Sequence, residues 1–436
     1  MKQPNIVIIL MDTMRIDALG VYNSALSTPA ADMLAKDSVV YENVITPSSW
    51  TLPAHISLFT GKYPSEHGIH ESYDVKTGNI VEGMHQGNFA LPVTIAEQLR
   101  KIGYNTVGIS ANNQISSYTR MDLGFNTFID ITKKDEVAEQ ATQYGRSRGE
   151  IAMNLARQGK FGEMIKLYRQ RGKHVKLSEN YPLDKGGNWI TWLLGRASIE
   201  SPFFLFINMM EMHDPYPSDV KYVPNQFHMN DLFKVKEIDP GLMARIRGEY
   251  FKQSTIADEY LSRIIRFLKS VYDETLIILT SDHGQALKER NYYGHGIYLY
   301  DELIRVPMVI KYPTSAKPAK EGLYSLVWAM EMLKGATEGI YEWKGQEFVI
   351  SETYGIQDSL EGIKISESVR REYDVPRKAI IKGNYKLVVN GANGNVEEFT
   401  VKGKPVDLND EMEKYEDLVN ELSLIKGNEK FLMPEI

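Results

Sequence analysis

The sequence predicts an α/β fold: one large, mostly parallel sheet sandwiched between helices, followed by a smaller C-terminal α+β domain. Three observations predict it. Unbroken apolar runs of strand length recur between residues 5 and 311, helical patterns fill the gaps between them, and polar residues follow the runs directly. Strands buried on both faces show such unbroken runs, and their alternation with helices is typical of a parallel sheet.

The first run, NIVIIL at residues 5–10, is rich in β-branched residues and is bounded by Pro4 and Asp12. Its length and composition indicate a buried strand. Four similar runs follow, at residues 105–110 (NTVGIS), 202–208 (PFFLFIN), 275–280 (TLIILT) and 306–311 (VPMVIK). Helical spacing is found at residues 28–36, 91–101 and 256–272.

Two parts of the chain differ from this alternation. Residues 131–200 are rich in charged residues and Gln, and we expect a helical insertion that either covers a site or is an elaboration without a role. After Pro313 the composition changes, which predicts a boundary between domains at residues 1–315 and 316–436. The second domain shows strand-like segments at residues 378–382 and 385–390 and an acidic helix at 409–422.

Composition excludes several classes of protein. The net charge of -7 argues against a nucleic-acid binder, which would show a basic face. The chain has no cysteine, so it forms no disulfide and no thiolate metal site. No apolar stretch reaches the roughly 20 residues that span a bilayer, and no signal-peptide pattern is present. We therefore expect a cytoplasmic protein with no membrane partner, and the sequence leaves its oligomeric state open.

Polar side chains follow the predicted strands at the points where the strands end. Asp12 follows the first strand, Asn112 the second and His213 the third, while Asp282 and His283 follow the fourth. Ligands of open α/β sheets bind outside the carboxyl ends of the strands. The sequence therefore predicts an active site at this edge of the sheet.

Asp282, His283 and Asp12 together predict a metal site. Three oxygen and nitrogen ligands leave coordination positions open for substrate, as catalytic metal sites require. We expect one or two divalent cations, Zn, Mn, Ca or Mg, and the imidazole makes Zn or Mn more plausible than an all-oxygen site would. The alternative is that these residues only cap strand ends.

Thr51 is predicted to begin a helix, because Pro53 suits a first helical turn. A hydroxyl at that place lies in the positive field of the helix N-terminus, which suits an anion such as phosphate or sulfate. The alternative is that Thr51 is an ordinary N-cap. His55 lies one turn further on the same helical face, so we expect it at the site as well.

Three further residues are candidates for the site. His295 lies between two glycines, so its backbone can approach another group closely. Arg15 could stabilise an anion or could pair with Asp17. Lys62 could bind substrate or could be a solvated loop residue.

The motifs of the chain resemble those of the sulfatase family of the alkaline phosphatase superfamily, in family order over most of residues 4–312. They are DTMRIDALGVY (12–22), TPAADMLAKDSVVYENV (28–44), SWTLPAHISLFTGKYPSEHG (49–68), FINMMEMHDPYP (206–217), TLIILTSDHG (275–284) and GHGIYLYDELIRVPMVI (294–310). The segment KAIIKGNYKLVVN resembles the small C-terminal sheet of the family. The resemblance implies an alkaline-phosphatase/sulfatase-like fold, a divalent metal ion and a small anionic ester as substrate.

The resemblance also implies a nucleophile and metal ligands. The family motif runs Cys or Ser, any residue, Pro, Ser, Arg, and Pro53 places Thr51 at the nucleophile, with Ala54 and His55 in place of Ser and Arg. Asp12 matches a metal ligand, and Thr13 replaces the second aspartate that usually follows it. Asp282 and His283 match the later metal pair, and we expect Thr51 to contact the metal too.

The remaining roles concern the substrate. His213 matches a substrate-side histidine, and His295 stands where sulfatases often place Lys or His near the leaving group. Asn112 and Gln114 stand where many sulfatases carry Lys and His. His55, Arg15, Lys62 or His213 would stabilise the non-bridging oxygens of the ester.

The absence of a formylglycine precursor favours phosphate esters over sulfate esters as substrates. A formylglycine hydrate releases sulfate by elimination, which a threonine cannot do, whereas a threonine phosphate can be hydrolysed at phosphorus. We therefore expect a metal-dependent hydrolase of phosphate mono- or diesters that uses Thr51. The alternatives are a sulfatase acting without formylglycine and a catalytically silent member with a binding role.

Overall fold

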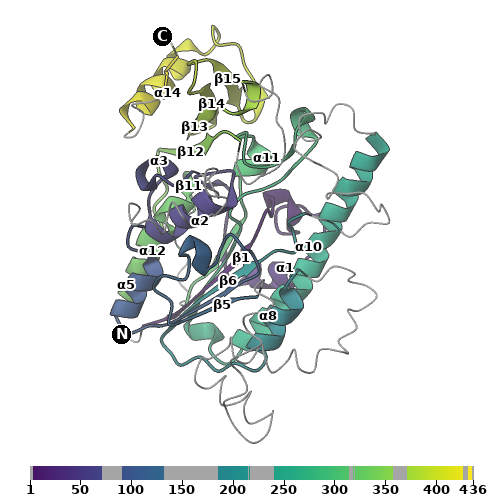
Figure 1. Ribbon diagram of the computed structural model, residues 1–436, viewed down its shortest axis with the longest axis vertical. Coiled ribbons are helices and arrows are strands. Elements are labelled where there is room, and N and C mark those ends of the chain that lie inside the picture. The colour runs from purple at the N-terminus through teal and green to yellow at the C-terminus, as the bar shows by residue number, and fades with distance from the viewer. Residues whose placement is uncertain are drawn as a thin grey trace, which may run out of the picture.

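The computed structural model describes residues 3–70, 91–131, 185–214, 216, 240–313, 318, 320–356, 371–425 and 431–434. In this part of the chain a seven-stranded sheet with helices on both faces forms the larger body, and a five-stranded sheet with one helix lies at the C-terminal end (Figure 1). The predicted α/β fold class is confirmed.

The strand order of the large sheet is β2-β10-β7-β1-β6-β4-β5. Five neighbouring strands run parallel: β7 (Thr275–Thr280), β1 (Asn5–Met11), β6 (Phe203–Met209), β4 (Asn105–Ser110) and β5 (Thr127–Asp130). β10 (Met308–Lys311) runs antiparallel to β7 and to β2 (Val39–Tyr41). Every residue of β1, β6 and β7 is buried, which explains their unbroken apolar sequences.

Alternate residues of β1 pack against the two helical layers. Val7 and Ile9 belong to a cluster with α1 (Pro29–Lys36), α8 (Gly187–Leu194) and α10 (Pro240–Leu268). Ile6 and Ile8 belong to a second cluster with α2 (Thr51–Thr60), α5 (Ile95–Lys101) and α12 (Ala329–Thr337). The two groups of helices lie on opposite sides of the sheet (Figure 1).

Short elements connect this body to the loops at the carboxyl edge of the sheet. They are β3 (Val44–Ile45), α3 (Pro64–His67), β8 (Ala286–Leu287), β9 (Tyr293–Gly294), α11 (Asp301–Ile304) and β11 (Tyr324–Ser325). Single 3-10 turns lie at Ile16–Ala18, Ser117–Thr119, Tyr272–Glu274, Glu289–Asn291 and Leu326–Trp328.

The C-terminal sheet is antiparallel, and the expected strands and acidic helix are present in it. Its strands are β12 (Phe348–Tyr354), β13 (Pro376–Lys382), β14 (Tyr385–Asn390), β15 (Val396–Val401) and β16 (Lys404–Pro405). α14 (Met412–Leu424) packs on one face of it. The domain boundary near residue 315 stays a prediction, because β11 pairs with β3.

Two predictions fall partly or wholly outside this description. Of the helical insertion at residues 131–200, the structure describes residue 131 and residues 185–200, which include α8; the segment between lies outside the described residues. No helix among the described residues is long and apolar enough to cross a membrane.

Candidate active site

Two carboxylates meet because two neighbouring strands end side by side. β1 and β7 are parallel and in register, with Leu10 opposite Thr280. Asp12 and Asp282 each lie two residues beyond this pair, and His283 follows Asp282. One ligand atom from each of Asp12, Asp282 and His283 lies within 4.8 Å of the others, and all three residues are buried.

In the described part of the chain, one oxygen of each carboxylate accepts hydrogen bonds and the other accepts none. Oδ2 of Asp12 accepts a hydrogen bond from Nδ2 of Asn112 (2.7 Å). Oδ1 of Asp282 accepts from the backbone amides of Thr13 (3.1 Å) and His283 (2.9 Å). Among the described residues, Asp12 Oδ1 and Asp282 Oδ2 are buried and form no hydrogen bond, and Asp282 Oδ2 lies 3.4 Å from Nε2 of His283 and 3.5 Å from Nδ1 of His55.

This donor set fits a divalent cation. Burial raises the pKa of Asp12 to about 6, with a further contribution from Asp282, and burial raises the pKa of Asp282 to about 7. Two buried carboxylates with unused oxygens destabilise the fold unless a cation compensates their charge. A cation held by Asp12, Asp282 and His283 would satisfy both oxygens.

Thr51 lies beside this group. It is the first residue of α2, and Trp50, not Thr51, is the N-cap. Its Oγ1 lies 3.1 Å from Nε2 of His283. Nδ1 of His283 lies 2.8 Å from the carbonyl oxygen of Gly284, which can only accept, so Nδ1 carries the proton. The lone pair of Nε2 therefore faces the Thr51 hydroxyl, which donates to it.

His55 holds the first turn of α2 in place. Its Nδ1 donates to the carbonyl oxygen of Thr51 (2.8 Å), and its Nε2 accepts from Nδ2 of Asn208 on β6 (2.9 Å). The ring is fully buried, and burial lowers its pKa to about 3. Both nitrogens are thus used inside the protein, so the structure places His55 behind Thr51 and not facing a substrate.

His213, His283 and His295 gather near Thr51 and Trp50. The ring centroid of His295 lies 4.5 Å from that of His283, 5.2 Å from that of His213 and 5.1 Å from that of Trp50. These contacts bring together the ends of β6 and β7 and the turn after β9. The predicted residues Thr51, Asp12, Asp282, His283, His213 and His295 are therefore neighbours.

The two predicted cationic residues, Arg15 and Lys62, lie outside this group of neighbouring side chains. Arg15 is buried and pairs with Asp17 and Glu289, both at 2.8 Å. Lys62 is exposed beyond the far end of α2. A ten-residue helix is about 15 Å long, so Lys62 lies well away from Thr51.

Asn112 and Gln114 follow β4 on the Asp12 side. Asn112 donates to Asp12, and its own Oδ1 accepts from the backbone amide of Gln114 (2.8 Å). Oε1 of Gln114 is buried and finds no hydrogen-bond partner among the described residues. Asn112 thus orients the Asp12 carboxylate. Gln114 is connected to that carboxylate only through its hydrogen bond to Asn112.

Four residues of the site were not predicted from the sequence. They are Trp50, Asn208, Asp214 and Gln285. Asp214 and Gln285 lie one and two residues after a predicted histidine, so sequence proximity was an available signal for both. Asn208 lies inside a buried strand, where one amide among apolar residues is a weaker signal.

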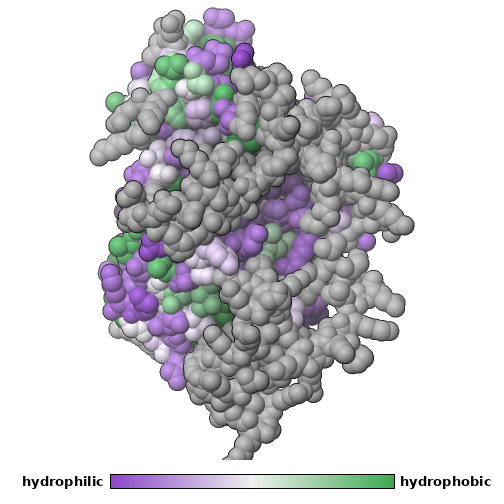
Figure 2. All heavy atoms as spheres, in the orientation of Figure 1, coloured by the Kyte–Doolittle hydropathy of each residue, from purple (hydrophilic) through white to green (hydrophobic). Residues whose placement is uncertain are grey.

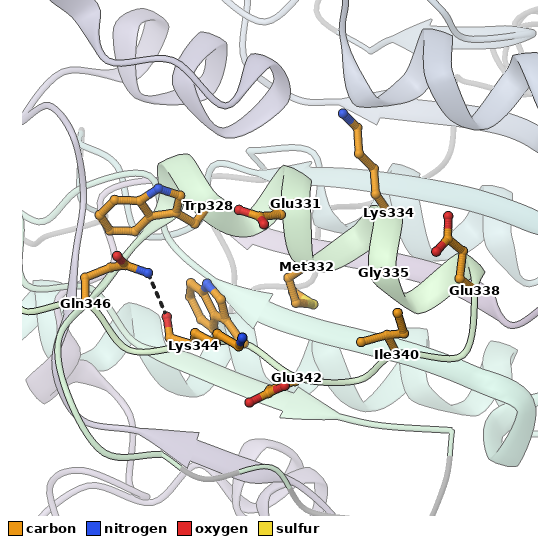
Figure 3. A pocket seen from close by; sticks show the side chains of 11 residues that line it. Trp328, Glu331, Met332, Lys334, Gly335, Glu338, Ile340, Glu342, Lys344 and Gln346 are labelled. Carbon is orange, nitrogen blue, oxygen red and sulfur yellow. Dashed lines mark hydrogen bonds between the residues drawn. The ribbon is translucent and has the colours of Figure 1, made fainter.

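Hydrophilic side chains also gather in a hollow near the centre of one face of the molecule (Figure 2). A separate hollow of about 380 Å³ lies between α12 and the segment that follows it (Figure 3). Trp328, Glu331 and Ile340 contribute to its lining, together with neighbouring residues up to Gln346. No residue of the Thr51 cluster lines it, so it is not part of the candidate active site.

Comparison with known proteins identifies the family to which the chain belongs. Residues 4–337 match the family described as Sulfatase. An ulvan-active sulfatase of Formosa agariphila is 26% identical over 71% of this chain, which spans 56% of that relative's length. An arylsulfatase of Clostridium perfringens is 23% identical over 73% of this chain and 71% of its own length.

Solved structures show the same fold. A 2-O GAG sulfatase superposes with a TM-score of 0.66 at 12% identity, covering 97% of this chain and 92% of its own. The phosphonate monoester hydrolase of Agrobacterium radiobacter gives a TM-score of 0.62 at 15% identity, covering 97% and 94%. At these identities the likeness concerns the fold alone.

Proposed function

Because the chain belongs to the sulfatase family, we propose that it is a metal-dependent hydrolase of sulfate esters whose nucleophile is Thr51. The observation that supports this most directly is the 3.1 Å contact between Thr51 Oγ1 and His283 Nε2, next to the unused oxygens of Asp12 and Asp282. A hydroxyl at a helix N-terminus beside a cation site is equipped to attack an anionic ester.

We rank sulfate esters as the first candidate substrate class because the curated relatives are named as sulfatases. The comparisons thus favour the alternative substrate over the phosphate ester that the sequence alone suggested. Phosphate mono- or diesters remain a second candidate, and Thr51 itself favours them. A threonine sulfate cannot eliminate sulfate and must be attacked at sulfur, whereas a threonine phosphate can be attacked at phosphorus.

The residues of the site have distinct tasks in this proposal. Asp12, Asp282 and His283 hold the cation, which when bound lowers the pKa of a neighbouring hydroxyl and offsets substrate charge. Thr51 oxygen attacks the central atom of the ester in line with the leaving oxygen. The positive end of α2 stabilises the non-bridging oxygens. His55 and Asn208 fix the turn from which Thr51 attacks.

A paired assay tests the proposal. Metal-stripped and Mn²⁺-reloaded protein would be given nitrophenyl sulfate, nitrophenyl phosphate and bis-nitrophenyl phosphate, with Thr51→Ala and Thr51→Ser as matched variants. We expect turnover of the sulfate that requires metal, is lost in Thr51→Ala and is partly kept in Thr51→Ser.

Other outcomes would correct the proposal. Dominant phosphate turnover would replace the substrate class and keep the nucleophile. Equal turnover by wild type and Thr51→Ala would refute the role of Thr51. No turnover together with no specific Mn²⁺ binding would make the chain a catalytically silent member of the family.

A further inference from the structure

Thr13, in the turn that follows β1, has a left-handed backbone conformation. Its φ is 58°, which β-branched residues rarely adopt, because the branched Cβ crowds the neighbouring backbone. The side chain does not offset this strain, since Oγ1 is buried and forms no hydrogen bond with any described residue. Backbone strain of this kind persists only where the surrounding structure holds it in place.

Part of that support comes from the end of β7. The backbone amide of Thr13 donates to Oδ1 of Asp282 (3.1 Å), and the backbone amide of Met14 donates to Oγ of Ser281 (2.9 Å). Ser281 and Asp282 follow β7 directly. Because Oδ1 of Asp282 accepts the Thr13 amide, Oδ2 is the oxygen that remains for a cation. The direction of the Thr13 amide therefore affects how the Asp282 carboxylate is turned.

A second part of the support comes from Tyr250 on α10. The hydroxyl of Tyr250 donates to the carbonyl oxygen of Thr13 (2.9 Å) and accepts from the backbone amide of Arg15 (2.8 Å). The side chain of Tyr250 is fully buried, so water does not replace these bonds when they are lost. One hydroxyl thus bridges the two backbone groups on either side of Met14 and closes the turn.

We propose that Tyr250 is a positioning residue that keeps Thr13 in its left-handed conformation, so that the Thr13 amide orients the Asp282 carboxylate toward the cation. This inference deepens the proposed function and rests on its cation site. Tyr250 acts through the backbone of Thr13, two residues of chain away from any bond that the reaction forms or breaks.

The strain of Thr13 explains why the bridge matters for cation binding. Without the Tyr250 hydroxyl, the turn relaxes toward an ordinary φ, and the Thr13 amide rotates away from Asp282. A cation then binds only the fraction of molecules in which the turn is left-handed, so its apparent affinity falls by that fraction. Glycine adopts a positive φ without strain, and at position 13 it would keep the turn left-handed without the bridge.

The first measurement is the dissociation constant of Mn²⁺, by equilibrium dialysis of the full chain. We expect Tyr250→Phe to raise it by about tenfold or more, as for other partners that orient metal ligands. Tyr22→Phe is the matched control, because the Tyr22 hydroxyl also bridges backbone groups, donating to Tyr41 (2.8 Å) and accepting from Met308 (3.0 Å). This control should change the dissociation constant by less than about twofold.

Two double variants separate positioning from a general loss of stability. Tyr250→Phe/Thr13→Gly and Tyr250→Phe/Thr13→Ala both remove the Thr13 hydroxyl and methyl group, and only glycine removes the strain. We expect the variant with glycine to bind Mn²⁺ at least about fivefold more tightly than the variant with alanine. Equal dissociation constants in the two double variants would overturn the inference.

The single variants keep the inference testable if Tyr250→Phe does not fold. In urea unfolding of metal-free protein, Thr13→Gly should have a higher midpoint than Thr13→Ala, which reverses the order at positions with an ordinary φ. The opposite order would show that position 13 is not strained, and would refute the inference.

Ester hydrolysis plays no part in these measurements. A wild type that binds Mn²⁺ and hydrolyses no ester would therefore overturn the proposed function, while the dissociation constants of the variants still decide the role of Tyr250. A wild type that binds neither Mn²⁺ nor Ca²⁺ would overturn both.

Discussion

Nδ2 of Asn112 donates a 2.7 Å hydrogen bond to Oδ2 of Asp12, and this bond leaves Oδ1 as the oxygen available for a cation. The two residues follow β1 and β4, which both pair with β6. Asn112 therefore orients a carboxylate of the proposed metal site, although the sequence suggested that Asn112 binds substrate.

Replacing Asn112 by Leu should weaken divalent metal binding. The carboxylate of Asp12 would lose its orienting donor, and partners of this kind typically contribute about 10–100-fold in metal affinity. Equilibrium dialysis with Mn²⁺ measures the change, and Asn113→Leu, at the exposed neighbouring position, is the control. An unchanged dissociation constant in Asn112→Leu would contradict this role.

Replacing Lys62 by Ala should leave catalysis nearly unchanged. Lys62 is exposed and lies beyond the end of α2 opposite to Thr51, so its charge is screened by solvent before it reaches the ester. We expect kcat and KM within about twofold of wild type, which corresponds to less than about 0.5 kcal/mol. A KM raised tenfold or more would show that Lys62 does contact substrate.

Glu289 should make part of the stability depend on pH. Burial alone would raise its pKa, but Arg15 outweighs burial, and the pKa falls from 4.5 to about 2. A lowered carboxyl pKa stabilises the fold fully above the unfolded pKa, and this stabilisation is lost as the pH falls from about 4.5 toward 2.

The variant Glu289→Gln removes this contribution. Its free energy of unfolding should be lower than that of wild type at pH 7, by about 2–3 kcal/mol at most, and the difference should shrink as the pH falls below 4.5. Urea unfolding at several pH values measures it, with the exposed Glu331→Gln as control. A difference that stays constant between pH 7 and 3 would speak against the ion pair.

Breaking the ion pair of Lys378 and Glu352 should lower the free energy of unfolding strongly. Lys378 Nζ lies 2.9 Å from Glu352 Oε1, and the side chains are 1% and 0% exposed. Glu352 also accepts hydrogen bonds from the amide and hydroxyl of Ser65, so it joins the C-terminal sheet to α3. Removing one partner of a buried pair leaves the other charge without compensation.

Lys378→Met should therefore lower the free energy of unfolding by about 3–5 kcal/mol. The double variant Lys378→Met/Glu352→Leu should lose less than the single one, because no buried charge is left alone. Lys252→Met, at an exposed lysine that pairs with the half-buried Glu249, should cost under about 1 kcal/mol. Chemical denaturation compares the three, and a double variant less stable than Lys378→Met would be evidence against this account.

Much of the fold was predictable because buried parallel strands leave an unbroken apolar signal. The runs at residues 5–10, 105–110 and 275–280 became β1, β4 and β7. β2 and β5 have only three and four residues, which is too short for a pattern to stand out. The helix expected at residues 256–272 begins at Pro240, since the hydrophilic side of α10 obscured its first turns.

The candidate site was predictable where a residue's place depends on a strand end. Asp12 and Asp282 follow directly from the ends of β1 and β7. Arg15 could not be placed in this way, because its long side chain reaches Glu289, 274 positions away. The hydrogen-bond partners of His55 and Thr51 are Asn208 on β6 and His283 in the loop after β7, and only the folded chain shows these contacts.

The register of β1 and β7 makes the spacing of the Asp12 and Asp282 carboxylates a property of the backbone ladder. No loop has to close for Asp12 and Asp282 to meet. The segment that follows β6 can therefore be exchanged during evolution, or grafted by a protein engineer, while the proposed cation site is kept. A change of substrate in this scaffold should require new loops and no new metal chemistry.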